Sequence, residues 1–183
     1  DMKCAKWAVE QLKKKHDKPF FMGVGFYRPH VPMYASQKWF DMHPRGKIKL
    51  PLVHKNDRKD LSQYAIDLTN LNHVSPTHKW VSEAGQWDHA VQSYLASVTF
   101  ADHCLGLVLD ALESSAYGKN TVIALFSDHG FHLGEKERWA KRSLWEDGTR
   151  VPIIVSAPGY KKDQRSDRPA ELLDVFPTLL ELA

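Results

Sequence analysis

A short apolar run at residues 121–126 constrains the fold of this 183-residue chain more than any other feature. The run is rich in β-branched and apolar residues, which is typical of a strand buried in a parallel sheet. It follows a long helical pattern, and a second apolar run at 151–155 comes after a charged, Trp-rich loop at 131–150. Alternating helices and strands predict an α/β fold, with a mostly parallel sheet and helices on both faces.

Periodicity predicts the helices around these strands. Asp88 can cap a long helix that Gly118 can close, and its apolar residues alternate spacings of four and three, at Val91, Leu95, Val98, Ala101, Leu105, Val108 and Leu112. Similar spacing predicts a helix from about Met2 to Leu12, and the chain closes on a helix at 171–183. The nearly continuous apolar run at 20–26 predicts a third strand, covered on both faces.

The stretch from residue 41 to residue 87 has no clear periodicity, apart from a short helix expected near 61–68. We therefore interpret 41–87 as an elaborated loop segment within a single domain that spans residues 1–183. Long connections in compact domains are often functional loops. The residues of this segment do not by themselves indicate a role.

Composition favours a globular chain with a weak preference for anionic partners. Hydrophobic residues make up 43% and charged residues 26%, and the net charge is +3. No apolar run approaches the roughly 20 residues of a membrane span, so no membrane partner is expected. The basic run Lys13–Lys15 lies at a predicted helix end, where a solvated face is the simpler interpretation. Cys4 and Cys104 lack the spacing of a zinc site, and we interpret both as buried thiols.

Two places carry residues suited to chemistry. Asp128 and His129 follow the strand at 121–126, and ligands bind outside the carboxyl ends of strands in such sheets. An acid beside an imidazole can hold a metal, although a capping Asp with a hydrogen-bonded His is an equal alternative. His30 lies between prolines that restrict its backbone, which suits either a catalytic imidazole or a structural one. The charged segment 134–146, taken alone, reads as a solvated amphipathic turn.

These places combine into a family pattern. The chain contains, in this order, Arg28-Pro29-His30-Val31-Pro32, Ser127-Asp128-His129-Gly130-Phe131-His132-Leu133-Gly134-Glu135, Trp139-Ala140-Lys141 and Arg150-Val151-Pro152. The composite resembles sulfatases of the alkaline phosphatase superfamily, most closely the iduronate-2-sulfatase-like group. The resemblance implies an alkaline phosphatase-like fold, present here as a partial domain. It also implies an exported sulfuric ester hydrolase, periplasmic or secreted in a bacterium and lysosomal in an animal, that acts on a sulfated sugar or a polysaccharide such as a glycosaminoglycan.

The resemblance also assigns roles to four residues. It implies that Asp128 and His129 bind a calcium ion, that Lys141 holds a sulfate oxygen, and that His30 lies near the ester oxygen. Calcium prefers oxygen ligands, whereas imidazole suits zinc and its neighbours. Contact of His129 with the sulfate or the nucleophile therefore stays open as an alternative.

The family nucleophile is a formylglycine made from the cysteine of a Cys-x-Pro-Ser-Arg type motif, and neither Cys4 nor Cys104 lies in one. The resemblance thus implies a C-terminal part of a catalytic domain, with the nucleophile and the remaining calcium ligands upstream, and an isolated fragment that is inactive. A sulfated carbohydrate is the expected partner, without nucleic acid. The alternatives are a phosphatase or phosphonate hydrolase of the same superfamily, and a non-enzymatic module that binds acidic polysaccharide.

Overall fold

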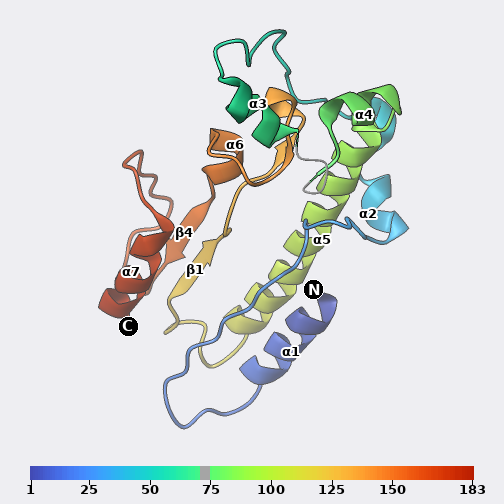
Figure 1. Cartoon of the computed structure of the whole chain (residues 1–183). Helices are drawn as coiled ribbons and strands as arrows, with labels where there is room; N and C mark the ends of the chain where they lie inside the picture. Colours follow the sequence, from blue (N-terminus) through green and yellow to red (C-terminus); the bar gives the residue numbers. More distant parts are fainter. Residues whose placement is uncertain (71–74) are drawn as a thin grey trace.

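The computed structural model describes residues 1–70 and 75–183, which are arranged around one long helix (Figure 1). This helix, α5 (Trp87–Glu113), packs against α1 (Met2–Leu12) and against the short α2 (Gln37–Asp41). The interface is built from small and apolar side chains that are buried, namely Ala5, Ala8 and Leu12 of α1 and Val91, Ala96, Cys104 and Leu112 of α5. Of the apolar residues whose spacing predicted α5, Val91 and Leu112 are buried, whereas Val98 is 39% exposed and the others are half-buried.

The ends of α5 differ from the expected caps. Gln86 is the N-cap residue, and Asp88 lies inside the first turn, where its carboxylate favours the positive end of the helix. Asp88 also accepts two hydrogen bonds from Arg45, at 2.8 and 2.6 Å. The helix ends at Glu113, and Gly118 packs behind it, since a Cβ there would lie only 2.7 Å from the Leu112 carbonyl oxygen.

By length and composition alone, α5 could cross a membrane. It has 27 residues, and an 18-residue window within it has a mean hydropathy of 1.4. Core helices of soluble proteins meet the same criterion, and α5 contributes to the packed interface with α1. The expected lack of a membrane partner stays a prediction.

The described strands form two short antiparallel ladders. β1 (Ile123–Phe126) pairs with β4 (Ile153–Ser156), and β2 (His132–Leu133) pairs with β3 (Trp139–Ala140). The strands expected at 121–126 and 151–155 are thus present within two residues. The prediction that the sheet is mostly parallel was wrong for these strands, because the connection between β1 and β4 returns without the crossover that a parallel pair requires.

The third expected strand, at 20–26, forms no ladder among the described residues. Its side chains alternate between exposed and half-buried from Phe21 to Phe26, which is the period of an extended chain covered on one face. Phe21 is 87% exposed, so the expectation of cover on both faces was wrong. The segment is extended in Figure 1, but no neighbouring strand pairs with its backbone there.

The remaining elements are short. The segment 41–87 contains η1 (Arg45–Lys47), α3 (Gln63–Thr69) and α4 (His78–Glu83), so the short helix expected near 61–68 is confirmed. The loop after β1 holds η2 (Glu135–Glu137) and α6 (Glu146–Thr149). The chain closes with η3 (Leu172–Asp174) and α7 (Val175–Leu182).

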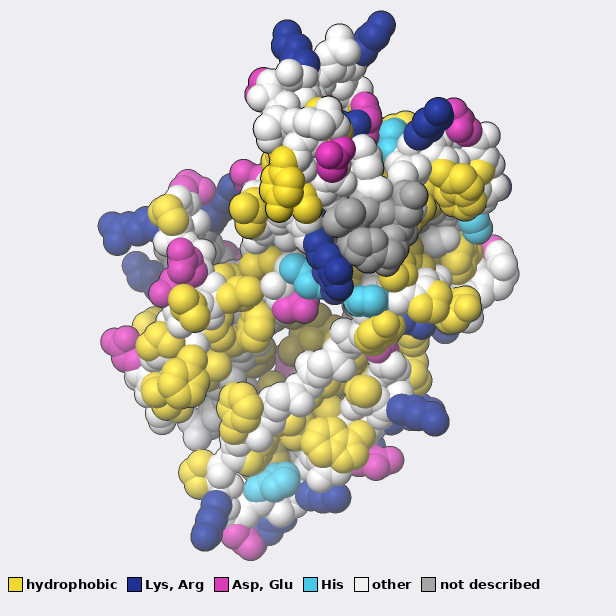
Figure 2. All heavy atoms as spheres, viewed as in Figure 1, with side chains coloured by type: hydrophobic (Ala, Val, Ile, Leu, Met, Phe, Trp, Pro, Cys, Tyr) yellow, Lys and Arg dark blue, Asp and Glu magenta, His cyan; other side chains and the backbone are white. Residues whose placement is uncertain are grey.

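An apolar face lies over β1, β4 and the closing helices (Figure 2). It consists of exposed large side chains, namely Phe126, Ile154, Val155, Leu173, Phe176 and Leu180. The two cysteines also differ in burial, since Cys104 is buried and Cys4 is exposed, contrary to the expectation that both are buried.

Candidate functional site

Lys141 follows directly after a small hairpin that is fixed onto the start of α5. The hairpin is the β2–β3 pair, and the Trp87 Nε1–H donates to the Leu133 carbonyl oxygen at 2.7 Å. Gly134 turns the chain with a φ of +128°, and a Cβ there would lie 2.9 Å from the Trp87 ring. Trp139 donates to His78 of α4 at 3.3 Å. These contacts set the position of the backbone that leads into Lys141.

Lys141 reaches His129, which follows β1. The Lys141 Nζ lies 2.7 Å from the His129 Nε2, and the His129 Nδ1 lies 2.8 Å from the Gly130 carbonyl oxygen. A carbonyl only accepts, so Nδ1 carries the proton and the Nε2 lone pair accepts from the ammonium group. The pair therefore presents a fixed positive charge beside a neutral imidazole at the carboxyl end of a strand.

Asp128 stands next to this pair. Its Oδ2 lies 3.6 Å from the His129 Nε2, and its side chain is 83% exposed. In the part of the chain that the structure describes, no group of three His, Cys, Asp or Glu side chains is arranged to hold a metal ion. Asp128 thus offers one open carboxylate, and any metal site here needs further ligands.

The structure does not join His30 to the other three residues. Its Nδ1 lies 2.6 Å from the Val31 carbonyl oxygen, and its ring packs on Tyr27 at 4.7 Å between centroids. Arg28 holds the loop, since its Nε donates to the Tyr34 carbonyl oxygen at 2.8 Å. The sequence therefore correctly predicted the meeting of Asp128, His129 and Lys141, while a place for His30 beside them stays a prediction.

A buried polar pair beside this site was missed by sequence reasoning. His132 is fully buried, and its Nε2 lies 2.7 Å from the Ser143 Oγ. Gly148 of α6 closes over the pair, because a Cβ there would lie 2.6 Å from that Oγ. The only signal in the sequence was a histidine at an apolar position of a charged loop. The pair ties the two ends of the loop that carries Lys141 together.

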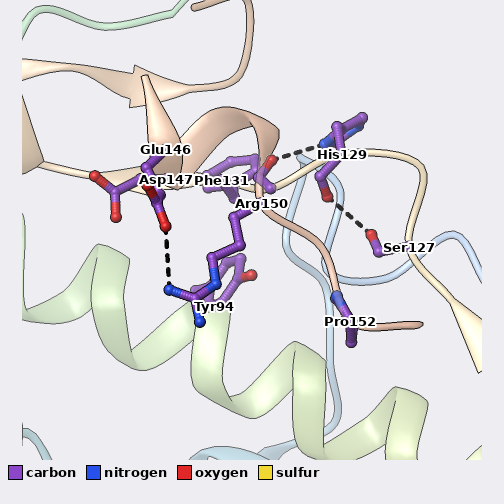
Figure 3. Close-up of a pocket in the computed structure, with 9 residues that line it drawn as sticks. Tyr94, Ser127, His129, Phe131, Glu146, Asp147, Arg150 and Pro152 are labelled. Atoms are coloured by element: carbon purple, nitrogen blue, oxygen red, sulfur yellow. Dashed lines mark hydrogen bonds and ion pairs between the residues drawn. The ribbon is translucent and has the colours of Figure 1, made fainter. Parts of the chain in front are cut away.

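An open cavity of about 400 Å³ adjoins His129 (Figure 3). Its walls come from α5, from the end of β1 and from α6, and the residues are Tyr94, Ser127, His129, Gly130, Phe131, Glu146, Asp147, Arg150 and Pro152. The Arg150 guanidinium extends toward α5 and pairs with Glu146 at 3.1 Å. Aromatic rings beside charged groups form a wall that suits a polar ring-shaped ligand.

The buried His132 should make stability depend on pH. Burial lowers its pKa, partly offset by Asp147 and Glu135. The folded protein thus binds fewer protons than the unfolded chain once the pH falls below the ordinary pKa near 6.5. Stability present at neutral pH is then lost on acidification, by at most about 1.4 kcal/mol per pH unit for this group. We expect urea unfolding to show this loss between pH 7.5 and pH 5.

The variant His132→Gln should flatten that slope, because an amide can still bond Ser143 but does not titrate. Some slope should remain, since burial also lowers the pKa of His78. Ser143→Ala is the matched control, which should reduce stability at every pH and keep the slope. An unchanged slope in His132→Gln would refute this account of the buried histidine.

Comparison with known proteins identifies the family. The sulfatase family model matches residues 1–183. A sulfatase from Formosa agariphila is 43% identical over 183 residues, which cover 100% of this chain and 36% of that protein. Iduronate 2-sulfatase from Mus musculus is 34% identical over 171 residues, which cover 87% of this chain and 30% of that protein.

A solved structure from Bacteroides thetaiotaomicron, described under the metabolism of multiple glycosaminoglycans, superimposes with a TM-score of 0.70 at 26% identity. The superposition covers 97% of this chain and 34% of that one. The chain belongs to the sulfatase family, and the predicted α/β, alkaline phosphatase-like fold, present as a partial domain, is confirmed. It spans about a third of the length of these relatives.

Proposed function

We propose that the full-length protein containing this chain hydrolyses sulfate esters of a sulfated sugar. The observation that carries the proposal is the Lys141 ammonium group, held 2.7 Å from the His129 Nε2 at the end of β1. The ammonium group has further N–H donors besides the one given to His129, and such a fixed cation is suited to an anionic group such as sulfate. The Asp128 carboxylate, 83% exposed, adds a position for a counter-cation.

The chemistry explains why a fixed cation helps. Hydrolysis breaks the bond between sulfur and the ester oxygen, adds water, and yields an alcohol, a sulfate dianion and a proton. Negative charge grows on the leaving oxygen in the transition state, so a preorganised cation stabilises that state more than the ground state. In our proposal Lys141 orients the sulfate, and His30 donates the proton that the leaving oxygen needs.

The residues partly fit the calcium ion that the family resemblance implies. Asp128 fits, because calcium prefers carboxylate oxygens and this carboxylate is open. His129 fits less well, since its only lone pair already accepts from a cationic ammonium group. We therefore propose that Asp128 is a metal ligand and that His129 holds the Lys141 ammonium group beside the sulfate. A bound calcium ion would supply electrostatic stabilisation of the anion.

The attacking nucleophile is proposed to lie outside this chain, as a formylglycine. Cys104 is buried in α5, and burial raises its pKa, which disfavours the reactive thiolate. Cys4 is exposed, but it lies inside α1 without the motif that the family modifies. Residues 1–183 would then be one part of a single catalytic domain, with 41–87 as an elaborated segment within it. We also propose that the protein is exported.

The relatives narrow the substrate class. One is an iduronate 2-sulfatase, and the solved structure is described under glycosaminoglycan metabolism. The cavity beside His129 has the Tyr94 and Phe131 rings in its wall, 5.3 Å apart between centroids, with Arg150 nearby. An aromatic wall with a cation suits a sugar that carries a carboxylate. We propose a sulfated uronic acid unit as the substrate.

The experiment is a substrate comparison with the full-length protein. We expect turnover of an aryl sulfate, turnover of a 2-O-sulfated uronic acid disaccharide, and hydrolysis of an aryl phosphate at a rate lower by roughly 100-fold or more, because discrimination depends on transition-state fit. Preferred hydrolysis of the phosphate would favour the phosphatase alternative. Salt-dependent polysaccharide binding without turnover of any ester would favour the binding-module alternative.

A further inference from the structure

We infer that the segment 57–69, named here the brace, positions Lys141 by holding the backbone that leads into it. The brace consists of the loop 57–62 and the helix α3 (Gln63–Thr69). This inference rests on the proposed function, since it assigns a role in the same reaction. It gives a task to part of the 41–87 segment, which the sequence left without one.

Two ion pairs tie the start of the brace to η2 (Glu135–Glu137). The Lys136 Nζ lies 2.9 Å from the Asp57 Oδ2, with side-chain exposures of 35% and 29%. The next residues along each segment, Arg58 and Glu137, form a second ion pair, in which the Arg58 side chain is 17% exposed. Adjacent residues thus form two ion pairs with alternating sign. Partial burial makes such pairs stronger and more restrictive than isolated surface pairs.

Thr69 joins the end of the brace to the same region. Its hydroxyl accepts from the Arg58 Nη1 at 2.8 Å, and its carbonyl oxygen accepts from the Arg138 Nη1 at 2.8 Å. That carbonyl lies at the end of α3, where helix carbonyls lack partners within the helix. Thr69 therefore joins the two ends of the brace through Arg58 and attaches the brace to Arg138.

Arg138 connects this junction to Lys141. Its side chain is 1% exposed, and its Nη2 donates to the Lys141 carbonyl oxygen at 3.1 Å. Within residues 1–70 and 75–183, Arg138 forms no ion pair with a carboxylate. Its guanidinium donates instead to two backbone carbonyl oxygens. The planar fork of one guanidinium presents Nη1 and Nη2 to the two acceptors in a fixed geometry, which the single nitrogen of an ammonium group does not reproduce.

The backbone around Lys141 adopts conformations that need support from the surrounding structure. Four non-glycine residues near it lie in the left-handed region, and these are Lys136, Glu137, Ala140 and Arg142. Ala140 and Arg142 flank Lys141 directly, with φ of 63° and 58°. Such conformations persist only where the surroundings determine them, and they collect at functional sites. The brace supplies that constraint, so the Lys141 ammonium stays at His129.

The test is a double-mutant cycle in the full-length enzyme, assayed with an aryl sulfate. We expect Arg138→Lys to lower kcat by roughly 10-fold with little change in KM, since a small misplacement of a catalytic group is costly. Asp57→Lys should act in the same direction, and adding Lys136→Asp should restore kcat, because the swapped pair has the opposite polarity. In a Lys141→Ala background, Arg138→Lys and Asp57→Lys should lower kcat by less than about 2-fold.

The matched control is Lys79→Gln, which removes an exposed ion pair with Glu83 in α4 and should leave kcat unchanged. Equal losses in both backgrounds would overturn the inference, because the brace would then support the fold and not Lys141. An unchanged kcat in both Arg138→Lys and Asp57→Lys would overturn it as well. If Arg138→Lys fails to fold, the charge swap between Asp57 and Lys136 still tests the inference. Failure of the proposed function is recognised separately, as absence of aryl sulfate turnover in the parent enzyme.

Discussion

Lys141→Ala should lower kcat of the full-length sulfatase by about 100-fold or more, which is the usual scale for the loss of one preorganised charge stabiliser. The ammonium group lies 2.7 Å from the His129 Nε2, and its backbone is held by Arg138. Removing it leaves the developing charge on the sulfate without its fixed cation. Because the interaction matters most in the transition state, kcat should fall more than KM rises.

Steady-state kinetics with an aryl sulfate would measure this loss. The fold should survive the substitution, because Lys141 is only half-buried and its described partner is a histidine, not a carboxylate. Lys162→Ala, at an exposed position of the same residue type, is the matched control and should stay at the parental rate. Activity of Lys141→Ala within a few-fold of the parent would show that Lys141 is a surface residue of no catalytic importance.

The isolated chain 1–183 should hydrolyse no sulfate ester and bind calcium weakly at best. Covalent catalysis needs an activated nucleophile, and the two cysteines lie in helices without the modified motif. Calcium sites use about six to eight oxygen ligands, whereas the described site offers the carboxylate of Asp128. Water would have to fill the remaining positions, so the ion would be held loosely.

Turnover of an aryl sulfate and a calcium titration on the purified chain would test both statements. The chain should also self-associate, since the outer edges of the β1–β4 ladder have no partner strand among the described residues, and Phe126, Ile154 and Phe176 are exposed there. Turnover that persists after Cys4→Ala and Cys104→Ala would contradict the account of the nucleophile. Tight calcium binding would contradict the account of an incomplete metal site.

Local patterns in the sequence were sufficient to predict the longer helices and two of the strands, but not the short helices α2, α4 and α6. The spacing of Val91 and Leu112 with the residues between them predicted α5, because packing on α1 demands one apolar face. The run at 121–126 predicted β1 within two residues. The parallel direction predicted for these strands was wrong, since direction depends on how the loop between β1 and β4 returns. The prediction of a strand at 20–26 failed for a similar reason, because a strand needs a neighbouring strand, which periodicity does not reveal.

The site was predictable only in part. Asp128, His129 and Lys141 could be placed together because a motif and a strand end coincide there, and their contacts agree with that placement. His132 and Arg138 could not be recognised, since each looks like an ordinary polar residue in a charged loop. Their importance comes from burial and from partners distant in sequence, such as Thr69, which no local pattern encodes.

The most direct test of the central claim is a crystal structure of the full-length protein with inorganic sulfate, the product of the proposed reaction. The account predicts one sulfate oxygen at hydrogen-bonding distance, about 3 Å, from the Lys141 Nζ. It also predicts that the His129 Nε2 still accepts from the Lys141 ammonium group, and that a cation lies on the Asp128 carboxylate. A sulfate bound elsewhere in a protein that turns over sulfate esters, with Lys141 extended into solvent, would contradict the account.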